Sequence, residues 1–331
     1  MLNGKSILVT GGTGSFGHQF VSYVLEHEPK KIIIYSRDEY KQFVMQNEYK
    51  KHPQADKLRF FIGDVRDKER LYRAFDGVDY VVHAAALKQV PSCEYNPMEA
   101  VKTNINGAMN IVDAALDCGV KRVVALSTDK AVNPINLYGG TKLVSDKLFI
   151  AANAYAGEKD VNFSIVRYGN VAGSRGSVIP FFRNIVANGG TSLPITDYRM
   201  TRFWISLEQG VELVIKALSE AKGGETFISK IPSFKITDLA QAILPGCEMP
   251  EVGIREGEKL HEIMVTREDS LLTYEYDKHF IVYPHFDWWD KDKIQTGGKK
   301  VEQGFEYSSG KNTEWLSVDD LKELLIDVKE H

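Results

Sequence analysis

The sequence predicts an α/β protein with a doubly wound parallel sheet and a smaller, discontinuous C-terminal domain. Two observations support this fold class. In the first half of the chain, short runs rich in Val and Ile alternate with longer amphipathic stretches, which is typical of a parallel sheet covered by helices. After about residue 170 the pattern becomes irregular, and glycine, proline and aromatic residues gather in loops.

The individual elements follow from these runs. Strands are expected at Ser6–Thr10, Lys31–Ser36, Leu58–Ile62, Tyr80–Ala84, Arg122–Ser127 and Phe163–Arg167. Helices are expected near Ser15–Glu26, Tyr40–Lys51, Lys68–Phe75, Met98–Cys118 and Tyr138–Ala156. This alternating order is Rossmann-like.

Further along, Leu207–Ala221 and Thr226–Ser229 again read as a helix and a strand that return to the main sheet. We therefore expect the nucleotide-binding domain to comprise residues 1–172 and about 203–230. The smaller domain, which would bind substrate, is expected at about 173–202 and 231–294, and 295–331 is left unassigned.

Composition narrows the class of protein. A formal net charge of −4 gives no general attraction to nucleic acid or anionic lipid. The N-terminus reads directly into a strand rather than a secretory signal, and no apolar run approaches the roughly 20 residues that span a bilayer. Cys93, Cys118 and Cys247 show neither a disulfide framework nor zinc-ligand spacing. We expect a cytoplasmic protein without bound metal, nucleic acid or membrane partner.

A glycine-rich loop follows the first expected strand and opens the first expected helix. Glycines there allow a tight turn and let the backbone approach a pyrophosphate, which the positive end of the helix would hold. The alternative is a simple turn, but the position between strand one and helix one favours a dinucleotide site. The residues concerned are Gly11, Thr13, Gly14, Ser15, Phe16 and Gly17.

The end of the second strand bears on the choice of dinucleotide. Ser36 and Arg37 occupy the place where an acidic residue would bind the ribose of NAD, and Lys41 follows. This chemistry suits a 2′-phosphate, so NADP is favoured over NAD. The alternative is a solvated loop in which Arg37 pairs with Asp38. After the third strand, Asp64, next to Val65, is placed to meet the adenine amine, or else caps a turn.

A catalytic pattern follows the fifth strand. Tyr138 and Lys142 stand one turn apart on a predicted helix, ten residues after Thr128. The Lys142 ammonium can lower the pKa of the Tyr138 phenol and hold a nicotinamide ribose, so that Tyr138 acts as acid and base for a carbinol. An isolated YxxxK match is more often structural; its place after strand five, with Thr128 upstream, favours the catalytic interpretation.

Six segments together resemble a known family. TGGTGSFG, HAAALKQVP, STDKAVNP, YGGTK, RYGNVAGSRGSVIPFF and ITDYRMTRFWIS are similar to the inverting UDP-N-acetylglucosamine 4,6-dehydratases, which are extended short-chain dehydrogenases/reductases. The resemblance covers at least Met1–His261. It implies the fold of the family, tightly bound and recycled NADP, UDP-N-acetylglucosamine as substrate and a homo-oligomer. It also implies a place in pseudaminic-acid biosynthesis and flagellin glycosylation.

The implied chemistry assigns roles to two more residues. Oxidation of the sugar at C4 acidifies the C5 hydrogen, and loss of the 6-hydroxyl then needs one group that takes a proton and one that gives it. Asp129 and Lys130 fit these needs; related retaining dehydratases carry an Asp-Glu pair there, and 4-epimerases carry no such pair. Lys130 must be neutral to act as a base, and we expect burial, Lys142 and the oxidised nicotinamide to depress its pKa. The alternative is a loop ion pair.

The resemblance also implies residues that contact the cofactor or the substrate. For most of them the alternative is a capping, buried polar or surface role. For Asn104 as well, the alternatives are a contact near the cofactor and substrate or a capping or buried polar role. The aromatic side chains of Phe181, Phe203 and Trp204 are expected in the core rather than stacked on a base. The implied positions are Ala84, Ala86 and Lys88 for the cofactor, and Lys88, Asn170, Arg175, Val178, Arg202, Arg255 and Glu258 for the substrate.

Two other functions remain as alternatives. One is a UDP-hexose 4-epimerase on the same fold, which would yield no 6-deoxy-4-keto product. The other is a non-catalytic NADP-sensing protein, which would not need Asp129, Tyr138 and Lys142. The presence of these three residues favours the dehydratase.

Overall fold

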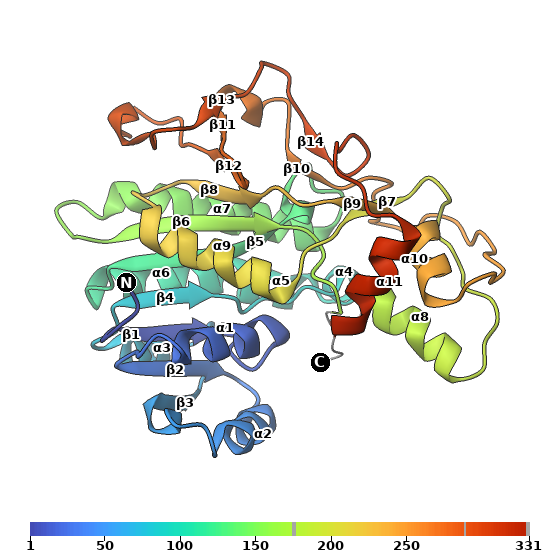
Figure 1. The fold of residues 1–331 in the computed structure, drawn as a ribbon. Helices are drawn as coiled ribbons and strands as arrows, with labels where there is room; N and C mark the ends of the chain where they lie inside the picture. Colours follow the sequence, from blue (N-terminus) through green and yellow to red (C-terminus); the bar gives the residue numbers. More distant parts are fainter. Residues whose placement is uncertain (174–176, 288, 329–331) are drawn as a thin grey trace.

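The computed structural model describes residues 1–173, 177–287 and 289–328. One large sheet dominates this part of the chain (Figure 1). Its parallel strands run in the order β3-β2-β1-β4-β5-β6-β8, and β12, β11 and β13 extend it in antiparallel pairs. The strands are β1 (Ser6–Thr10), β2 (Lys31–Ser36), β3 (Leu58–Ile62), β4 (Tyr80–His83), β5 (Arg122–Thr128), β6 (Asn162–Tyr168), β8 (Thr226–Ser229), β11 (Thr273–Glu275), β12 (His279–Val282) and β13 (Lys299–Lys300). The predicted doubly wound parallel sheet is confirmed.

The parallel strands end at a common edge, and this edge positions the site. Thr10 of β1 lies in register with Tyr35 of β2 and with His83 of β4, and Thr128 of β5 lies in register with Tyr168 of β6. The loops that follow these strands therefore open side by side. Ligands of such sheets bind at this edge, where the strand order reverses between β1 and β4.

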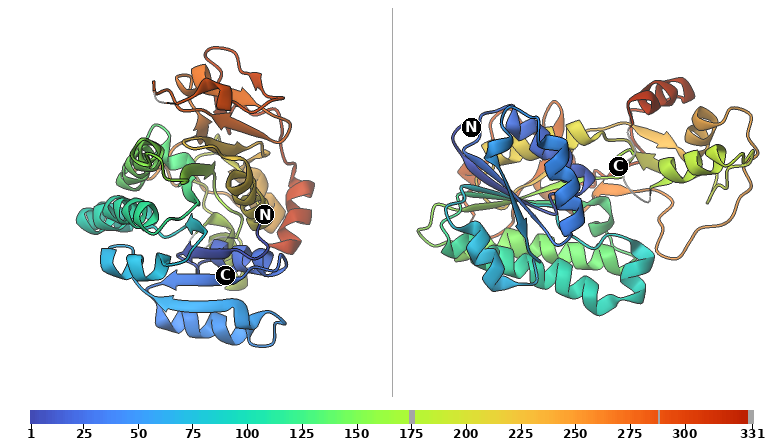
Figure 2. Two further views of the ribbon diagram at one scale, coloured as in Figure 1. Left: turned by 90° about the vertical axis from the view of Figure 1, so that its left-hand side faces the viewer. Right: turned by 90° about the horizontal axis from the view of Figure 1, so that it is seen from below.

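Helices cover both faces of the sheet (Figure 2). On β1, Ile7 and Val9 contact one layer, whereas Leu8 contacts the other, and all three are fully buried. Burial on both faces explains why the strand is apolar throughout. The first layer contains α1 (Ser15–Leu25), α2 (Glu39–Tyr49) and α9 (Leu207–Glu220), and the second contains α3 (Lys68–Phe75), α6 (Gly107–Asp117) and α7 (Leu137–Tyr155).

The stretch predicted as one helix at Met98–Cys118 is interrupted in the structure. It comprises α5 (Pro97–Val101), a π-helical turn (Lys102–Asn106) and α6. Gly107 begins α6, and a Cβ at this position would lie 2.8 Å from a methyl group of Val65. The helix therefore lies very close to the loop after β3. Single π turns in helices are frequent near functional sites.

The smaller part of the structure lies beyond the carboxyl edge of the sheet (Figure 1). Phe182, Trp204, Leu239 and Leu321 belong to its buried core, which joins segments far apart in the sequence. The C-terminal helix thus packs with this part. Its elements are α8 (Val178–Ala187), β7 (Thr201–Phe203), β9 (Ser233–Lys235), α10 (Ile236–Ile243) and α11 (Val318–Asp327). Strands β10 (Ile263–Val265) and β14 (Tyr307–Ser308) pair with each other, and their buried residues join the core of the main sheet.

The domain boundaries expected from the sequence remain a proposal. Strands β11 and β12 fall in 231–294, the range expected for the smaller domain, yet they hydrogen-bond to the main sheet through β8. Of the aromatic residues expected in the core, Phe203 and Trp204 are buried, but the prediction for Phe181 was wrong because its side chain is 45% exposed.

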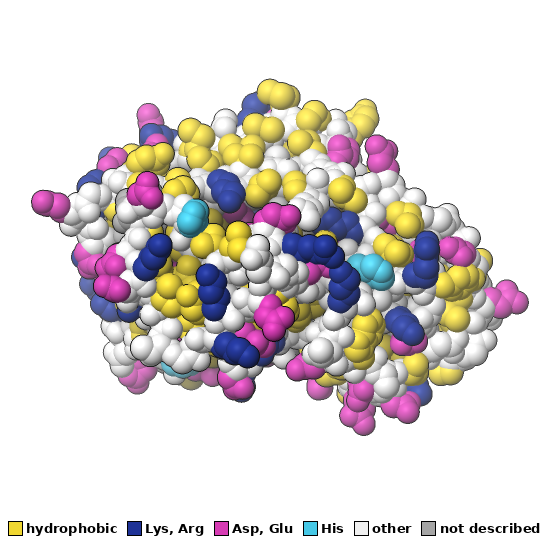
Figure 3. Space-filling view, turned by 90° about the horizontal axis from the view of Figure 1, so that it is seen from above, with side chains coloured by type: hydrophobic (Ala, Val, Ile, Leu, Met, Phe, Trp, Pro, Cys, Tyr) yellow, Lys and Arg dark blue, Asp and Glu magenta, His cyan; other side chains and the backbone are white. Residues whose placement is uncertain are grey.

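The helices, cysteines and surface charges bear on the other expectations from composition. No helix among the described residues is long and apolar enough to cross a bilayer. Cys93, Cys118 and Cys247 are free thiols. On the face shown in Figure 3, Lys and Arg side chains lie among acidic and apolar ones, so neither charge covers the whole face.

Candidate active site

The glycine-rich loop joins β1 to α1 at the carboxyl edge of the sheet. Gly11 has a φ of +67°, a backbone conformation that favours glycine. Gly14 is the N-cap of α1, no side chain caps the helix, and its first turn carries no acidic residue. Thr13 Oγ1 lies 2.8 Å from Ser36 Oγ. The exposed N–H groups and positive dipole of this helix end fit a dinucleotide pyrophosphate. The loop brings together Gly11, Thr13, Gly14, Ser15, Phe16 and Gly17.

The loop after β2 holds two cations that are paired with carboxylates. Arg37 Nη1 lies 3.6 Å from Asp64 Oδ2. Lys41 Nζ lies 3.3 Å from Asp38 Oδ2, and the Asp38 carboxylate also caps α2. The structure therefore does not show the Arg37–Asp38 pair that was considered as an alternative. Instead Arg37 bridges the ends of β2 and β3.

Asp64 is engaged by arginine side chains in this structure. Its Oδ2 accepts hydrogen bonds from Arg66 Nε at 2.9 Å and from Arg66 Nη2 at 2.7 Å. Burial pushes the pKa of Asp64 upward, but the hydrogen bonds from Arg66 outweigh it and hold the pKa below its usual value. Val65 is buried against Gly107. The role of Asp64 at an adenine stays a prediction.

The loop after β4 crosses the same edge of the sheet. Ala84 and Ala86 are partly exposed and Lys88 is exposed. Asn104 is buried, and its side chain accepts a hydrogen bond from Leu87 N at 2.9 Å and donates one to Leu87 O at 2.9 Å. Asn104 therefore fixes the shape of this loop, which is the buried polar role considered as its alternative.

Tyr138 and Lys142 lie on α7, and both side chains are buried. The Thr128 hydroxyl donates a hydrogen bond to Asp129 Oδ1 at 2.9 Å. Burial raises the pKa of Tyr138 to about 12, although the Lys130 ammonium and the Thr128 hydroxyl act against this rise. Burial also lowers the pKa of Lys142, against the attraction of Asp146 one turn away. The lowering of the Tyr138 pKa by Lys142 stays a prediction; in this structure Lys130 also supplies a nearby positive charge.

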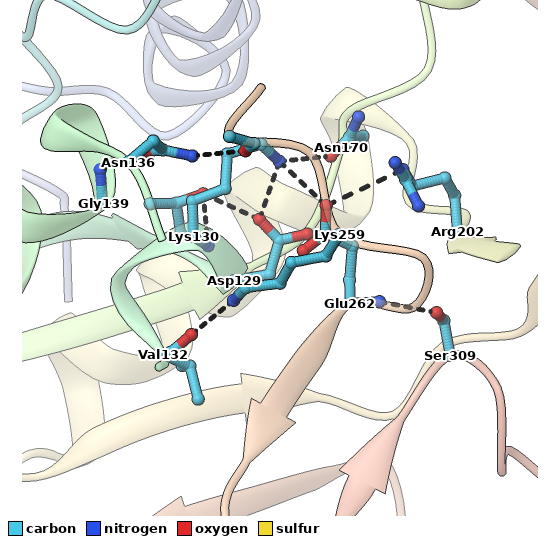
Figure 4. A network of polar contacts seen from close by, with 12 residues as sticks. Asp129, Lys130, Val132, Asn136, Gly139, Asn170, Arg202, Lys259, Glu262 and Ser309 are labelled. Atoms are coloured by element: carbon cyan, nitrogen blue, oxygen red, sulfur yellow. Dashed lines mark hydrogen bonds and ion pairs between the residues drawn. The ribbon is translucent and has the colours of Figure 1, made fainter. Parts of the chain in front are cut away.

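Asp129 and Lys130 begin a 3₁₀ turn directly after β5 (Figure 4). Lys130 Nζ lies 3.1 Å from Asp129 Oδ1 and 3.0 Å from Asn170 Oδ1. Burial acts to lower the pKa of Lys130, but Asp129 and Glu262 outweigh burial and raise the pKa well above its usual value. The expected depressed pKa was therefore wrong. Burial raises the pKa of Asp129, and the Glu262 charge adds to this rise.

Glu262 and Lys259 were missed by the sequence interpretation. Glu262 is buried, and its Oε1 lies 3.4 Å from Lys130 Nζ and 3.7 Å from Arg202 Nε. Lys259 Nζ donates a hydrogen bond to the Val132 carbonyl, and burial lowers the Lys259 pKa. Glu262 lies 132 residues from Lys130 in the sequence, so no spacing pattern joins them.

Of the expected substrate residues, Asn170 and Arg202 lie beside the catalytic turn, and the roles of the others stay predictions. Asn170 accepts a hydrogen bond from Lys130, and Arg202 is buried beside Glu262. Asn136 at the start of α7 holds the segment of Arg255 and Glu258 by donating a hydrogen bond to Gly257 O at 2.8 Å. Two further positions are Val178, which begins α8, and Arg175, which lies outside the described residues.

Comparison with known proteins identifies the family. The model of a polysaccharide biosynthesis protein family matches residues 7–284. The chain belongs to this family. A relative from Campylobacter jejuni, named UDP-N-acetylglucosamine 4,6-dehydratase (inverting), is 55% identical over 98% of each chain. The family resemblance found in the sequence motifs is thereby confirmed. A relative from Rickettsia prowazekii, named UDP-glucose 4-epimerase, is 41% identical over 97% of this chain and 95% of its own.

Solved structures agree with this family. The protein Pen from Bacillus thuringiensis is 37% identical and superposes with a TM-score of 0.89 over 99% of this chain and 98% of its own. DesIV from Streptomyces venezuelae, a dTDP-glucose 4,6-dehydratase solved with NAD bound, is 26% identical, with a TM-score of 0.69 over 77% of this chain and 86% of its own. The fold of this chain is therefore shared with a nucleotide-sugar 4,6-dehydratase solved with NAD bound.

Proposed function

We propose that this protein is a hydro-lyase that removes water from UDP-N-acetylglucosamine and inverts C5, yielding a UDP-2-acetamido-2,6-dideoxy-4-keto-hexose. One observation carries the proposal: the buried Asp129 and the partly buried Lys130 form an ion pair beside the buried Tyr138. Oxidation at C4 needs one acid/base group, whereas elimination across C5 and C6 needs a second proton acceptor and a proton donor. The name of the Campylobacter jejuni relative supports the same reaction.

The residues at the end of β1 and β2 fit a nicotinamide dinucleotide. The first turn of α1 would hold the pyrophosphate, and Ser36, Arg37 and Lys41 would bind the 2′-phosphate of NADP. Lys142, buried on α7, would hold the nicotinamide ribose. When bound, the nicotinamide would supply an acceptor for the C4 hydride and the source of the hydride that C6 receives, while a proton added to C5 from the opposite face would complete the inverted product.

Tyr138 serves the oxidation half of the reaction. Its phenol takes the proton of the 4-hydroxyl, which requires the phenolate form. Burial disfavours this form, and the Lys130 ammonium and the Thr128 hydroxyl stabilise it. Thr128, the last residue of β5, and Lys130 in the turn that follows therefore also assist Tyr138 on α7.

Asp129 and Lys130 serve the elimination half. In the described structure they form an ion pair, so the pair holds one proton on the lysine. Transfer of this proton from Nζ to Asp129 Oδ1, across 3.1 Å, yields a neutral amine and a carboxylic acid together. Lys130 then takes the C5 proton, and the C5–H electron pair forms the C5–C6 double bond. The C6–O bond breaks as Asp129 gives its proton to the departing hydroxyl, and the ion pair returns.

Product analysis tests the proposal. Purified protein is incubated with UDP-N-acetylglucosamine, and the product mass and C5 configuration are determined. Loss of one water with inversion at C5 is the expected result. A product of unchanged mass with an inverted C4 would refute the dehydratase.

A UDP-hexose 4-epimerase is the second candidate, favoured by the name of the Rickettsia prowazekii relative. It shares the need for Tyr138 and a dinucleotide but gives no role to Asp129 and Lys130. A non-catalytic sensor would use none of the three. The same incubation separates these alternatives, because only the dehydratase releases water.

Finer parts of the proposal rest on the sequence. We propose NADP rather than NAD as the cofactor because of Ser36, Arg37 and Lys41. A homo-oligomer in the cytoplasm, and a place in pseudaminic-acid biosynthesis for flagellin glycosylation, follow from the family resemblance. Extraction of the bound cofactor tests the choice of NADP, and measurement of the mass in solution tests the homo-oligomer.

A further inference from the structure

Glu262 brings a second buried carboxylate to the catalytic pair. It precedes β10, in a part of the sequence remote from the turn that follows β5. Its side chain reaches Lys130 across the carboxyl edge of the sheet (Figure 4). We propose that Glu262 is a positioning residue of the elimination step. Its carboxylate holds the Lys130 ammonium beside Asp129, and its charge sets the pH range in which this pair carries one proton. The inference rests on the proposed function.

The geometry gives Lys130 Nζ a closed set of partners. Asp129 Oδ1 lies at 3.1 Å, Asn170 Oδ1 at 3.0 Å and Glu262 Oε1 at 3.4 Å. The ammonium can donate three hydrogen bonds, so these acceptors occupy its donors and fix its position. The other oxygens of both carboxylates, Asp129 Oδ2 and Glu262 Oε2, are buried without a hydrogen-bond partner among the described residues.

The backbone of Glu262 is held independently of its side chain. Glu262 N donates to Ser309 Oγ at 2.9 Å, and Ser309 N donates to Glu262 O at 2.8 Å. Arg202 also donates to the Thr201 and Leu260 carbonyls, at 2.7 Å and 3.3 Å. Replacing the Glu262 carboxylate by an amide therefore removes a charge while these contacts stay.

The charge of Glu262 affects both protons of the pair. Elimination requires one proton on the pair, because two protons leave no base and none leaves no acid. A buried negative charge makes each proton harder to remove, so it raises both pH values that bound this range. Removing the charge must therefore move both limits to lower pH. The titratable and charged groups that face the pair and Glu262 from the surrounding elements are Tyr138, Arg202 and Lys259.

The test compares three substitutions: one removes the Glu262 charge, one moves this charge away from Lys130, and one leaves it in place. Water loss from UDP-N-acetylglucosamine is measured across pH for wild type, Glu262→Gln, Glu262→Asp and the control Glu256→Gln, whose side chain is exposed on the same segment. We expect both limits of the profile to fall by about one pH unit or more in Glu262→Gln. They should fall less in Glu262→Asp and stay in place in Glu256→Gln. Reduction of the bound nicotinamide, followed by absorbance, should persist in Glu262→Gln.

A merely structural role predicts a different result. Rates would then fall at every pH while the limits of the profile stayed in place, and this outcome would overturn the inference. If Glu262→Gln does not fold, unmoved limits in Glu262→Asp would have the same meaning. Failure of the proposed function is distinguishable, because wild-type enzyme would then release no water at any pH.

Discussion

Gly139 offers a strong test of how closely α7 must approach the catalytic turn. It follows Tyr138 in the helix, and a Cβ built on it would overlap the Lys130 carbonyl oxygen and lie 3.1 Å from Pro134 Cβ. The neighbouring Gly140 has nothing within 4 Å of such a Cβ. Replacing each by alanine therefore adds the same methyl group, once into the backbone of the turn and once into open space.

The two substitutions should act in opposite directions. Alanine is favoured over glycine in a helix by up to about 1 kcal/mol, so Gly140→Ala should stabilise the protein slightly. In Gly139→Ala the same gain in stability is opposed by the cost of overpacking, which is roughly 1–3 kcal/mol. To relieve the overlap, α7 and the turn must separate, and a misplacement of about 1 Å lowers catalytic rates on the order of 100-fold.

Thermal unfolding and product formation measure both effects. Gly140→Ala should raise the melting temperature by roughly 2 °C and keep wild-type turnover. Gly139→Ala should melt at or below the wild-type temperature and form product about 100-fold more slowly. A Gly139→Ala variant with normal turnover would refute the close approach of α7 to Lys130. An equal loss of turnover in both variants would show that any glycine replacement in this helix lowers activity, whether or not it disturbs the contact with Lys130.

Four further predictions concern the reaction, its cofactor and the absence of a metal. Tyr138→Phe should abolish reduction of bound nicotinamide by UDP-N-acetylglucosamine, whereas Lys130→Met should allow slow reduction without product; normal turnover of the Met variant would remove Lys130 from the mechanism. In deuterated water, wild-type product should carry label at C5 and an unlabelled substrate hydrogen at C6, and absence of the C5 label would contradict the elimination. Extraction should recover NADP(H), and recovery of NAD alone would reject the role of Ser36, Arg37 and Lys41. Activity should survive a chelator, and its loss and return with added zinc or magnesium would contradict a metal-free reaction.

Local sequence patterns were enough to predict much of the fold. Strands Ser6–Thr10, Lys31–Ser36 and Leu58–Ile62 have the bounds expected from their apolar runs, because strands buried on both faces leave a continuous signal. The helix predicted at Met98–Cys118 was less accurate, because a π turn interrupts it at Lys102–Asn106 and a new helix begins at Gly107 against Val65. Strands β11–β13 also escaped prediction, because short strands added at a sheet edge carry little periodicity of their own.

The sequence by itself determined the parallel sheet, the glycine loop and the placement of Tyr138 and Lys142 one turn apart, since each depends on residues near one another in the chain. Only the tertiary structure decided the charge state of the catalytic turn. Glu262 reaches Lys130 through the fold, and because the Glu262 carboxylate is buried, water screens their attraction less than on the surface. For this reason the pKa of Lys130 is raised rather than lowered, and the base expected to be neutral lies between two carboxylates.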